Sequence, residues 1–271
     1  MRQQAVPGRR SRRLTLLTPP VGPGATPGGS TLAATWRSRV TLRIGEFAGF
    51  PPEAFRFYAE LEVEGNNDRA WFDANRSTYE RAVRLPMEEL LDRAAADGFG
   101  DDGKVFRPNR DVRFSKDKRP YKGHCGAVVN HDDGTATASI YAQVDATGLV
   151  AGRGYWHLSR DQLDRFRRAV DDDGIGGELV GLVAAARAAG HEVEGSELKR
   201  APQGYPVDHP RIELLRHKRL AVLHRWPVAD WMHTPAAYDH LAGLWRDAAP
   251  IAAWLERHVG AAAEPRRRRG G

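Results

Sequence analysis

The sequence has 271 residues, of which 41% are hydrophobic and seven are tryptophan, so it can build one large domain or two small ones. No apolar run approaches the roughly 18 residues of a membrane span, so we expect no membrane partner. The formal charge is +6 and the pI about 9.7, values that by themselves would suggest nucleic-acid binding.

The positive charge is concentrated at the two ends of the chain. Residues 1–45 contain eight arginines and no acid, and residues 266–269 are four consecutive arginines. Without these twelve, 29 basic residues face 35 acidic ones in residues 46–265, which leaves a net charge of −6. The body of the protein is therefore mildly acidic, and its pI is no argument that it binds nucleic acid.

Three regions are predicted from composition. Residues 1–45 are rich in Arg, Pro, Gly, Ser and Thr and form a disordered extension, with an organelle-targeting sequence as the weaker alternative. Residues 46–260 form a single domain, and residues 261–271 form a disordered Arg-rich tail. The two basic ends are where a nucleic acid could be contacted.

Helices are predicted at the start of the domain. The first opens at Pro51-Pro52, the second follows a cap at Asp68, and the third opens at Pro86 and ends at Gly98. The helical spacing places six aromatic or aliphatic side chains in the core: Phe55, Tyr58, Leu61, Trp71, Phe72 and Tyr79.

Strands are predicted in the middle of the domain. Residues 104–114 and 124–153 favour short strands, with turns at Asp133-Gly134 and at 146–148, which is typical of an antiparallel meander. Residues 220–226 predict one more strand.

Helices return toward the C-terminus. One is capped by Ser159, one covers roughly 175–189, and a short one runs from a cap at Asp208 to Arg216. Residues 191–207 have no regular pattern. The stretch 234–259 is helical with a break at Pro250. We therefore predict an α+β fold, in which an antiparallel meander sheet packs with N-terminal and C-terminal helices.

The segment Phe106–His124, called the basic segment below, is the predicted functional centre. From Lys104 to Lys122 there are eight Lys or Arg residues and only two acids, Asp111 and Asp117. A bend at Pro108-Asn109 would bring the arginines together, and convergent guanidinium groups match a phosphate or a carboxylate.

The candidate roles follow from side-chain chemistry. Asp111 would orient an arginine or act as a base, and Tyr121 or His124 would handle a proton. The candidate ligand-binding residues are Arg107, Arg110, Arg113, Lys116, Lys118, Lys199 and Arg200. Lys199 and Arg200 would belong to a second wall of the same pocket. The alternative is a structural network, in which Arg110 with Asp111 and Asp117 with Lys118 are ion pairs.

Other chemistry has little support in the sequence. The single cysteine, Cys125, excludes an internal disulfide and fits a reducing compartment, so we expect a cytoplasmic protein. The ten histidines lack the spacing of metal ligands, so no metal site is predicted. No GxGxxG, P-loop or GxSxG motif is present, so no cofactor is identified.

The basic segment also resembles a known family. RPNRDVRFSKDKRPYKGH is similar to the signature of the bacterial and fungal family called domain of unknown function 2461, and NNDRAWFDANRSTYERAVRLP and LKRAPQGYPVDHP extend the likeness to about residues 47–258. The matching positions are Arg107, Arg110, Asp111, Arg113, Phe114, Asp117, Lys118 and Tyr121. The resemblance implies a single α+β domain and no established activity.

Two functions are consistent with these residues. The first is an enzyme or binding domain for an anionic small molecule, such as a phosphorylated or carboxylated compound. The second is a nucleic-acid-binding or protein-interaction module that uses the basic segment, the tails and stacking aromatic residues.

Overall fold

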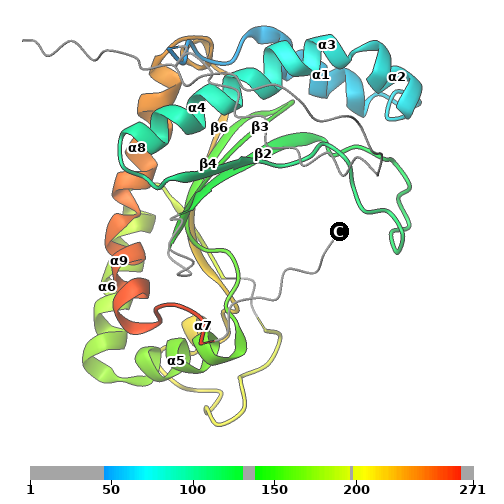
Figure 1. The fold of residues 1–271 in the computed structure, drawn as a ribbon. Helices are drawn as coiled ribbons and strands as arrows, with labels where there is room; N and C mark the ends of the chain where they lie inside the picture. The colour runs from blue at the N-terminus through cyan, green and yellow to red at the C-terminus, as the bar shows by residue number, and fades with distance from the viewer. Residues whose placement is uncertain (1–45, 131–137, 196–197, 264–271) are drawn as a thin grey trace, which may run out of the picture. The chain divides into compact units, whose positions relative to one another are not determined.

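Figure 1 shows a computed structural model, which describes residues 46–130, 138–195 and 198–263. These residues belong to the second of two compact units, Leu42–Gly271. The predicted extension at 1–45, the turn at Asp133-Gly134 and most of the predicted tail lie outside the described residues.

Within the described residues, six strands form one antiparallel sheet in the order β1-β2-β3-β4-β6-β5. The strands are β1 (Asp102–Val105), β2 (His124–Asn130), β3 (Ser139–Asp145), β4 (Gly148–Tyr155), β5 (Glu192–Glu194) and β6 (Leu220–Pro227). The predicted α+β fold with an antiparallel meander is confirmed.

Helices precede, follow and interrupt the strands. The first group is α1 (Pro52–Glu62), α2 (Arg69–Ala74), α3 (Arg76–Thr78), the π-helix η1 (Tyr79–Arg84) and α4 (Leu85–Ala96). The second group is α5 (Arg160–Asp171), α6 (Asp173–Ala188), α7 (Ile212–Leu215), the 3-10 helix η2 (Asp230–His233), α8 (Ala236–Asp247) and α9 (Ala249–His258). No helix of the described part of the chain is long and apolar enough to span a membrane.

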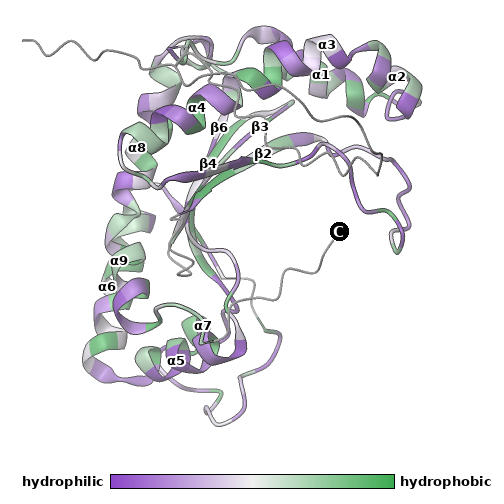
Figure 2. Cartoon of the chain, viewed as in Figure 1, coloured by the Kyte–Doolittle hydropathy of each residue, from purple (hydrophilic) through white to green (hydrophobic). Residues whose placement is uncertain are grey.

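One face of the sheet carries the helices, as Figure 1 shows along the outer side of the curved strands. Helix α4 contacts β1 and β2, α1 contacts β3, and α8 and α9 contact β4. Side chains alternate between the two faces of a strand, so every second residue is buried under the helices. On β3, Ile140, Ala142 and Val144 are buried, while Tyr141 and Gln143 between them are only partly covered. Figure 2 shows that both the helices and the strands carry hydrophobic as well as hydrophilic residues.

Two predicted caps are confirmed by hydrogen bonds. Asp68 accepts from the backbone N–H of Trp71 at 2.8 Å. Ser159 and Gln162 form a reciprocal capping box at the start of α5. Helices α8 and α9 divide at Ala248, so the break predicted near Pro250 is also confirmed.

Three predicted features are wrong. The strand predicted over 104–114 ends at Val105, because the basic segment turns away from the sheet. Residues 192–194 form the edge strand β5 within the region expected to be irregular; three residues are too few to show a period. Asp208 does not cap α7, which begins at Ile212 with Arg211 in the cap position.

The predicted third helix is α4, which begins at Leu85, one residue before Pro86. This helix continues directly from η1, and the Leu85 N–H donates to the Glu80 carbonyl. A proline inside a regular α-helix clashes with the carbonyl four residues earlier, and the wider π turn before Pro86 relieves that clash.

Gly154 on β4 should not tolerate a side chain. Its φ is +155°, and a Cβ there would lie 2.3 Å from the Leu220 carbonyl oxygen. Gly154→Ala should lower the free energy of unfolding by at least about 1–3 kcal/mol, measured by urea denaturation. The control is Gly177→Ala on α6, where a Cβ meets no atom within 4 Å. It should raise stability by about 1 kcal/mol, because alanine favours helix.

Candidate functional site

The basic segment is a long loop between β1 and β2 that closes on itself. The Arg110 N–H donates to the Pro120 carbonyl at 2.8 Å, and the Lys122 N–H donates to the Pro108 carbonyl at 2.9 Å. Asn109 and Tyr121 pair as an isolated antiparallel bridge. The predicted bend at Pro108-Asn109 is therefore part of a short ladder, and Figure 2 shows the loop as mostly hydrophilic.

Asn67 and an aromatic cluster hold this ladder against the first helices. The Asn67 side chain donates to the Tyr121 carbonyl at 3.2 Å and accepts from the Tyr121 N–H at 3.0 Å. The Tyr121 ring is buried and stacks on Phe72, with ring centres 4.0 Å apart and planes 11° apart. Phe72 in turn contacts Phe57 and Tyr79. Tyr121 is thus a core residue, and its role in this structure is to anchor the segment.

Two aspartates neutralise much of the positive charge of the segment. Asp117 accepts from Arg110 at 2.7 Å and from Arg119 at 2.8 Å, while Asp111 accepts from Arg113 at 2.7 Å. The Arg113 guanidinium lowers the pKa of Asp111 to about 2, and the Arg119 and Arg110 guanidinium groups hold the pKa of Asp117 well below its usual range. The partners differ from the predicted pairs, Arg110 with Asp111 and Asp117 with Lys118.

The bonds to arginine reduce the basicity of the two aspartate carboxylates. A carboxylate whose pKa is about 2 is a weak base at neutral pH, so Asp111 is poorly suited to remove a proton. At the tip of the loop, Phe114 is 97% exposed and Lys116 is exposed as well. Lys118 donates to the Val112 carbonyl at 3.0 Å, so it braces the tip.

The first of two hollows beside the segment is called the Arg107 hollow. It has a volume of about 290 Å³ and lies between η1 and the start of the segment. Its lining residues are Arg76, Tyr79, Glu80, Arg84, Val105, Phe106, Arg107, Pro108 and Asn109. Among the sequence-predicted site residues, Arg107 is the one that lines it.

The second hollow, called the His124 hollow, has a volume of about 220 Å³. Its lining residues are Glu62, Asn67, Arg110, Asp117, Arg119, Tyr121, Lys122, Gly123 and His124. Burial and the Lys122 ammonium lower the pKa of His124, against the opposing effect of Asp145, its register partner on β3. Burial and Lys122 therefore favour the neutral form of the imidazole.

The structure does not bring Lys199 and Arg200 to this site. They follow β5, which is the last strand at one edge of the sheet, whereas the basic segment leaves β1 at the opposite edge. Neighbouring strands are about 4.8 Å apart, so five spacings separate the two edges. Figure 1 shows the two loops at different ends of the sheet.

Two arginines of the Arg107 hollow were missed by the sequence reasoning. Arg76 bonds Asp73 at 2.5 Å, and Arg84 bonds Glu88 at 2.8 Å. Arg76, Glu80, Arg84 and Glu88 recur every fourth residue, which is the spacing of a single helix face. That pattern is visible in the sequence, but nothing local connects it to a segment that begins 22 residues after Arg84.

The described residues contain no group of three or more His, Cys, Asp or Glu side chains arranged to hold a metal ion.

Asn67→Ala tests the anchor of the basic segment. Losing both bonds leaves the N–H and carbonyl of Tyr121 without their partner, so the free energy of unfolding should fall by about 1–3 kcal/mol. The control is Asn66→Ala, because the Asn66 side chain makes an exposed bond to the Glu60 carbonyl. Chemical denaturation of both variants measures the difference, and equal losses would show that Asn67 is no anchor.

The pKa of His124 tests the electrostatics of the second hollow. Its NMR titration should have a midpoint below 6.5, because burial and Lys122 oppose the charged form. Lys122→Met should raise the midpoint, and Asp145→Asn should lower it further. A lowered histidine pKa means that the unfolded chain binds more protons, so this residue's contribution to stability should fall as the pH drops below 6.5. Shifts of the same sign in both variants would contradict the assignment.

Comparison with protein-family models gives a match. A family model described as "Conserved hypothetical protein (DUF2461)" matches residues 53–254, which include both hollows and the whole sheet. A search of curated proteins finds none that matches the chain. The match covers most of the chain and confirms the predicted family. The protein is a member of the DUF2461 family.

Proposed function

We propose that the protein binds the anionic group of a small molecule, a phosphate or a carboxylate, in the Arg107 hollow. The observation that carries the proposal is the state of Arg107, which is exposed and makes no ion pair with any described residue. Guanidinium groups bind phosphates and carboxylates through two parallel hydrogen bonds, which is the interaction that Arg107 has free to offer.

The other charges of the hollow favour an anion as well. Arg76, Arg84 and Arg107 face a single acid, Glu80, among the lining residues. Arg76 pairs with Asp73 of α2, and Arg84 pairs with Glu80 of η1 and Glu88 of α4, which restrains both arginines and lowers the local charge. Arg107 then supplies a positive charge that forms no ion pair with a described residue.

Lys122 adds to the positive potential from the other side of the segment. Its ammonium group donates to the Arg107 carbonyl at 2.8 Å and lies 5.7 Å from the centre of the Phe106 ring. Burial and the Arg107 charge lower the pKa of Lys122. Burial and the repulsion between Lys122 and Arg107 both disfavour the charged lysine. An anion bound beside these two side chains would reduce that repulsion.

The proposed role of the Arg107 hollow is binding alone, because neither candidate proton-handling side chain, Tyr121 or His124, lines it. Tyr121 is buried in the aromatic cluster, and His124 lines the other hollow. A volume of about 290 Å³ accommodates the charged end of a metabolite, with Tyr79, Phe106 and Pro108 beside it.

Three variants of the full chain test the proposal. Ligands would be screened by thermal shift with inorganic phosphate, phosphorylated sugars and dicarboxylates. A compound that binds only the native state stabilises it by about 2.7 kcal/mol at a hundred times its Kd. Arg107→Ala should abolish this stabilisation and leave the unliganded protein near its original stability, because the side chain is exposed and makes no ion pair with a described residue.

Two control variants distinguish a loss of anion binding from a general loss of charge or stability. Arg113→Ala removes an exposed arginine of the same loop and should leave binding unchanged. Arg110→Ala should lower stability by about 1 kcal/mol or more, because Arg110 bonds both Asp117 and the Arg119 carbonyl. Equal binding by Arg107→Ala and the wild type would refute the proposal. Binding of single-stranded nucleic acid whose affinity falls steeply with salt would favour the alternative function.

A further inference from the structure

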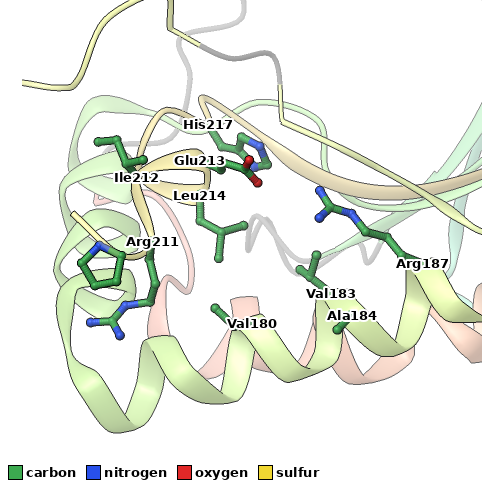
Figure 3. Close-up of a pocket in the computed structure, with 10 residues that line it drawn as sticks. Val180, Val183, Ala184, Arg187, Arg211, Ile212, Glu213, Leu214 and His217 are labelled. Atoms are coloured by element: carbon green, nitrogen blue, oxygen red, sulfur yellow. The ribbon is translucent and has the colours of Figure 1, made fainter. Parts of the chain in front are cut away.

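A third hollow lies at the other edge of the sheet and contains none of the sequence-predicted site residues. It has a volume of about 350 Å³ and lies between α6 and α7 (Figure 3), and α6 contacts the edge strand β5. We call it the Arg187 hollow. Its lining residues are Val180, Val183, Ala184, Arg187, Pro210, Arg211, Ile212, Glu213, Leu214 and His217.

The floor of the hollow is apolar. Val180, Val183 and Ala184 lie on one face of α6, since positions three and four residues apart are neighbours on a helix. Leu214 of α7 covers the opposite side (Figure 3). Val180 is 44% exposed, so part of this apolar floor is open to a ligand.

The wall that carries α7 is fixed to the domain through Arg211. Its guanidinium donates to the Val170 carbonyl at 2.6 Å, the Asp171 carbonyl at 2.7 Å and the Asp173 carboxylate at 2.9 Å. Figure 3 shows Arg211 pointing away from the centre of the hollow. These bonds fix the residue that precedes α7, and the charge of Arg211 is already matched by Asp173.

Two other charges lie above the floor and remain unmatched. Arg187 is one turn beyond Val183 on the same face of α6, and Glu213 precedes Leu214 on α7. Neither side chain forms an ion pair with a described residue, although Figure 3 shows both extending over the hollow from opposite walls. A ligand with an acid alone would be repelled by Glu213, and one with an amine alone would be repelled by Arg187.

We infer that the Arg187 hollow binds a small zwitterion with an apolar body, the class to which free apolar amino acids belong. The carboxylate pairs with Arg187, the ammonium with Glu213, and the side chain lies on Val180, Val183 and Leu214. This site is separate from the Arg107 hollow and does not depend on the function proposed there.

The first experiment compares ligands that differ only in charge. The full chain is titrated by calorimetry with L-leucine, L-phenylalanine, 4-methylpentanoate, which has only the acid, and 3-methylbutylamine, which has only the amine. The amino acids should bind, and each singly charged compound should bind at least about tenfold more weakly, because one charge-assisted hydrogen bond is lost. No binding of either amino acid, or equal binding of the acid and the amino acid, overturns the inference.

The second experiment uses variants with matched controls. Arg187→Gln and Glu213→Gln should each weaken leucine binding by at least about tenfold. The controls are Arg257→Gln and Glu178→Gln, which remove the same charges from an ion pair of 2.7 Å between α9 and α6 outside the hollow. They should leave binding unchanged. Equal effects of the test and control variants would assign the binding to general surface charge and overturn the site.

Discussion

The two hydrogen bonds between the Asn67 side chain and the backbone of Tyr121 are the constraint on which the candidate anion site depends. They join the turn between α1 and α2 to the last residues of the basic segment, 54 positions later in the chain. Because the Tyr121 ring also stacks on Phe72, the segment is fixed in position and in orientation. Residues of this ladder line both the Arg107 hollow and the His124 hollow.

The arginines of the basic segment differ in whether an aspartate of the segment pairs with them. Arg113 and Arg119 each follow an aspartate by two residues, and in both cases the carboxylate accepts from the backbone N–H and the guanidinium of that arginine. This local motif neutralises each arginine within its own turn. Arg107 has Val105 at the corresponding position, so it lacks this local partner. The contrast explains how one dense cluster of cations contains both a structural network and a charge available to a ligand.

The sequence predicted those features that depend on neighbouring residues. The caps at Asp68 and Ser159 and the alternation on β3 are local, and the structure confirms them. The π-helix, the strand β5 and the partners of Arg110 depend on distant contacts, and no local period indicates them. The distance of Lys199 from the basic segment depends on the strand order, which places β5 and β1 at opposite edges of the sheet. The order of strands in a sheet cannot be deduced from the composition of the loops.

The sheet also explains why the hollows lie at its edges. In its centre, Ala127, Ala142 and Ala151 are register partners on β2, β3 and β4, and their small side chains let the helices approach closely. Trp245 of α8 is fully buried, and its indole N–H donates to the Tyr141 carbonyl at 3.2 Å. The three alanines of the sheet and the large Trp245 side chain of α8 therefore pack closely and leave little open volume at the centre of the sheet. Open volume therefore remains where strands and helices end, and there the loops bring charged side chains beside apolar walls.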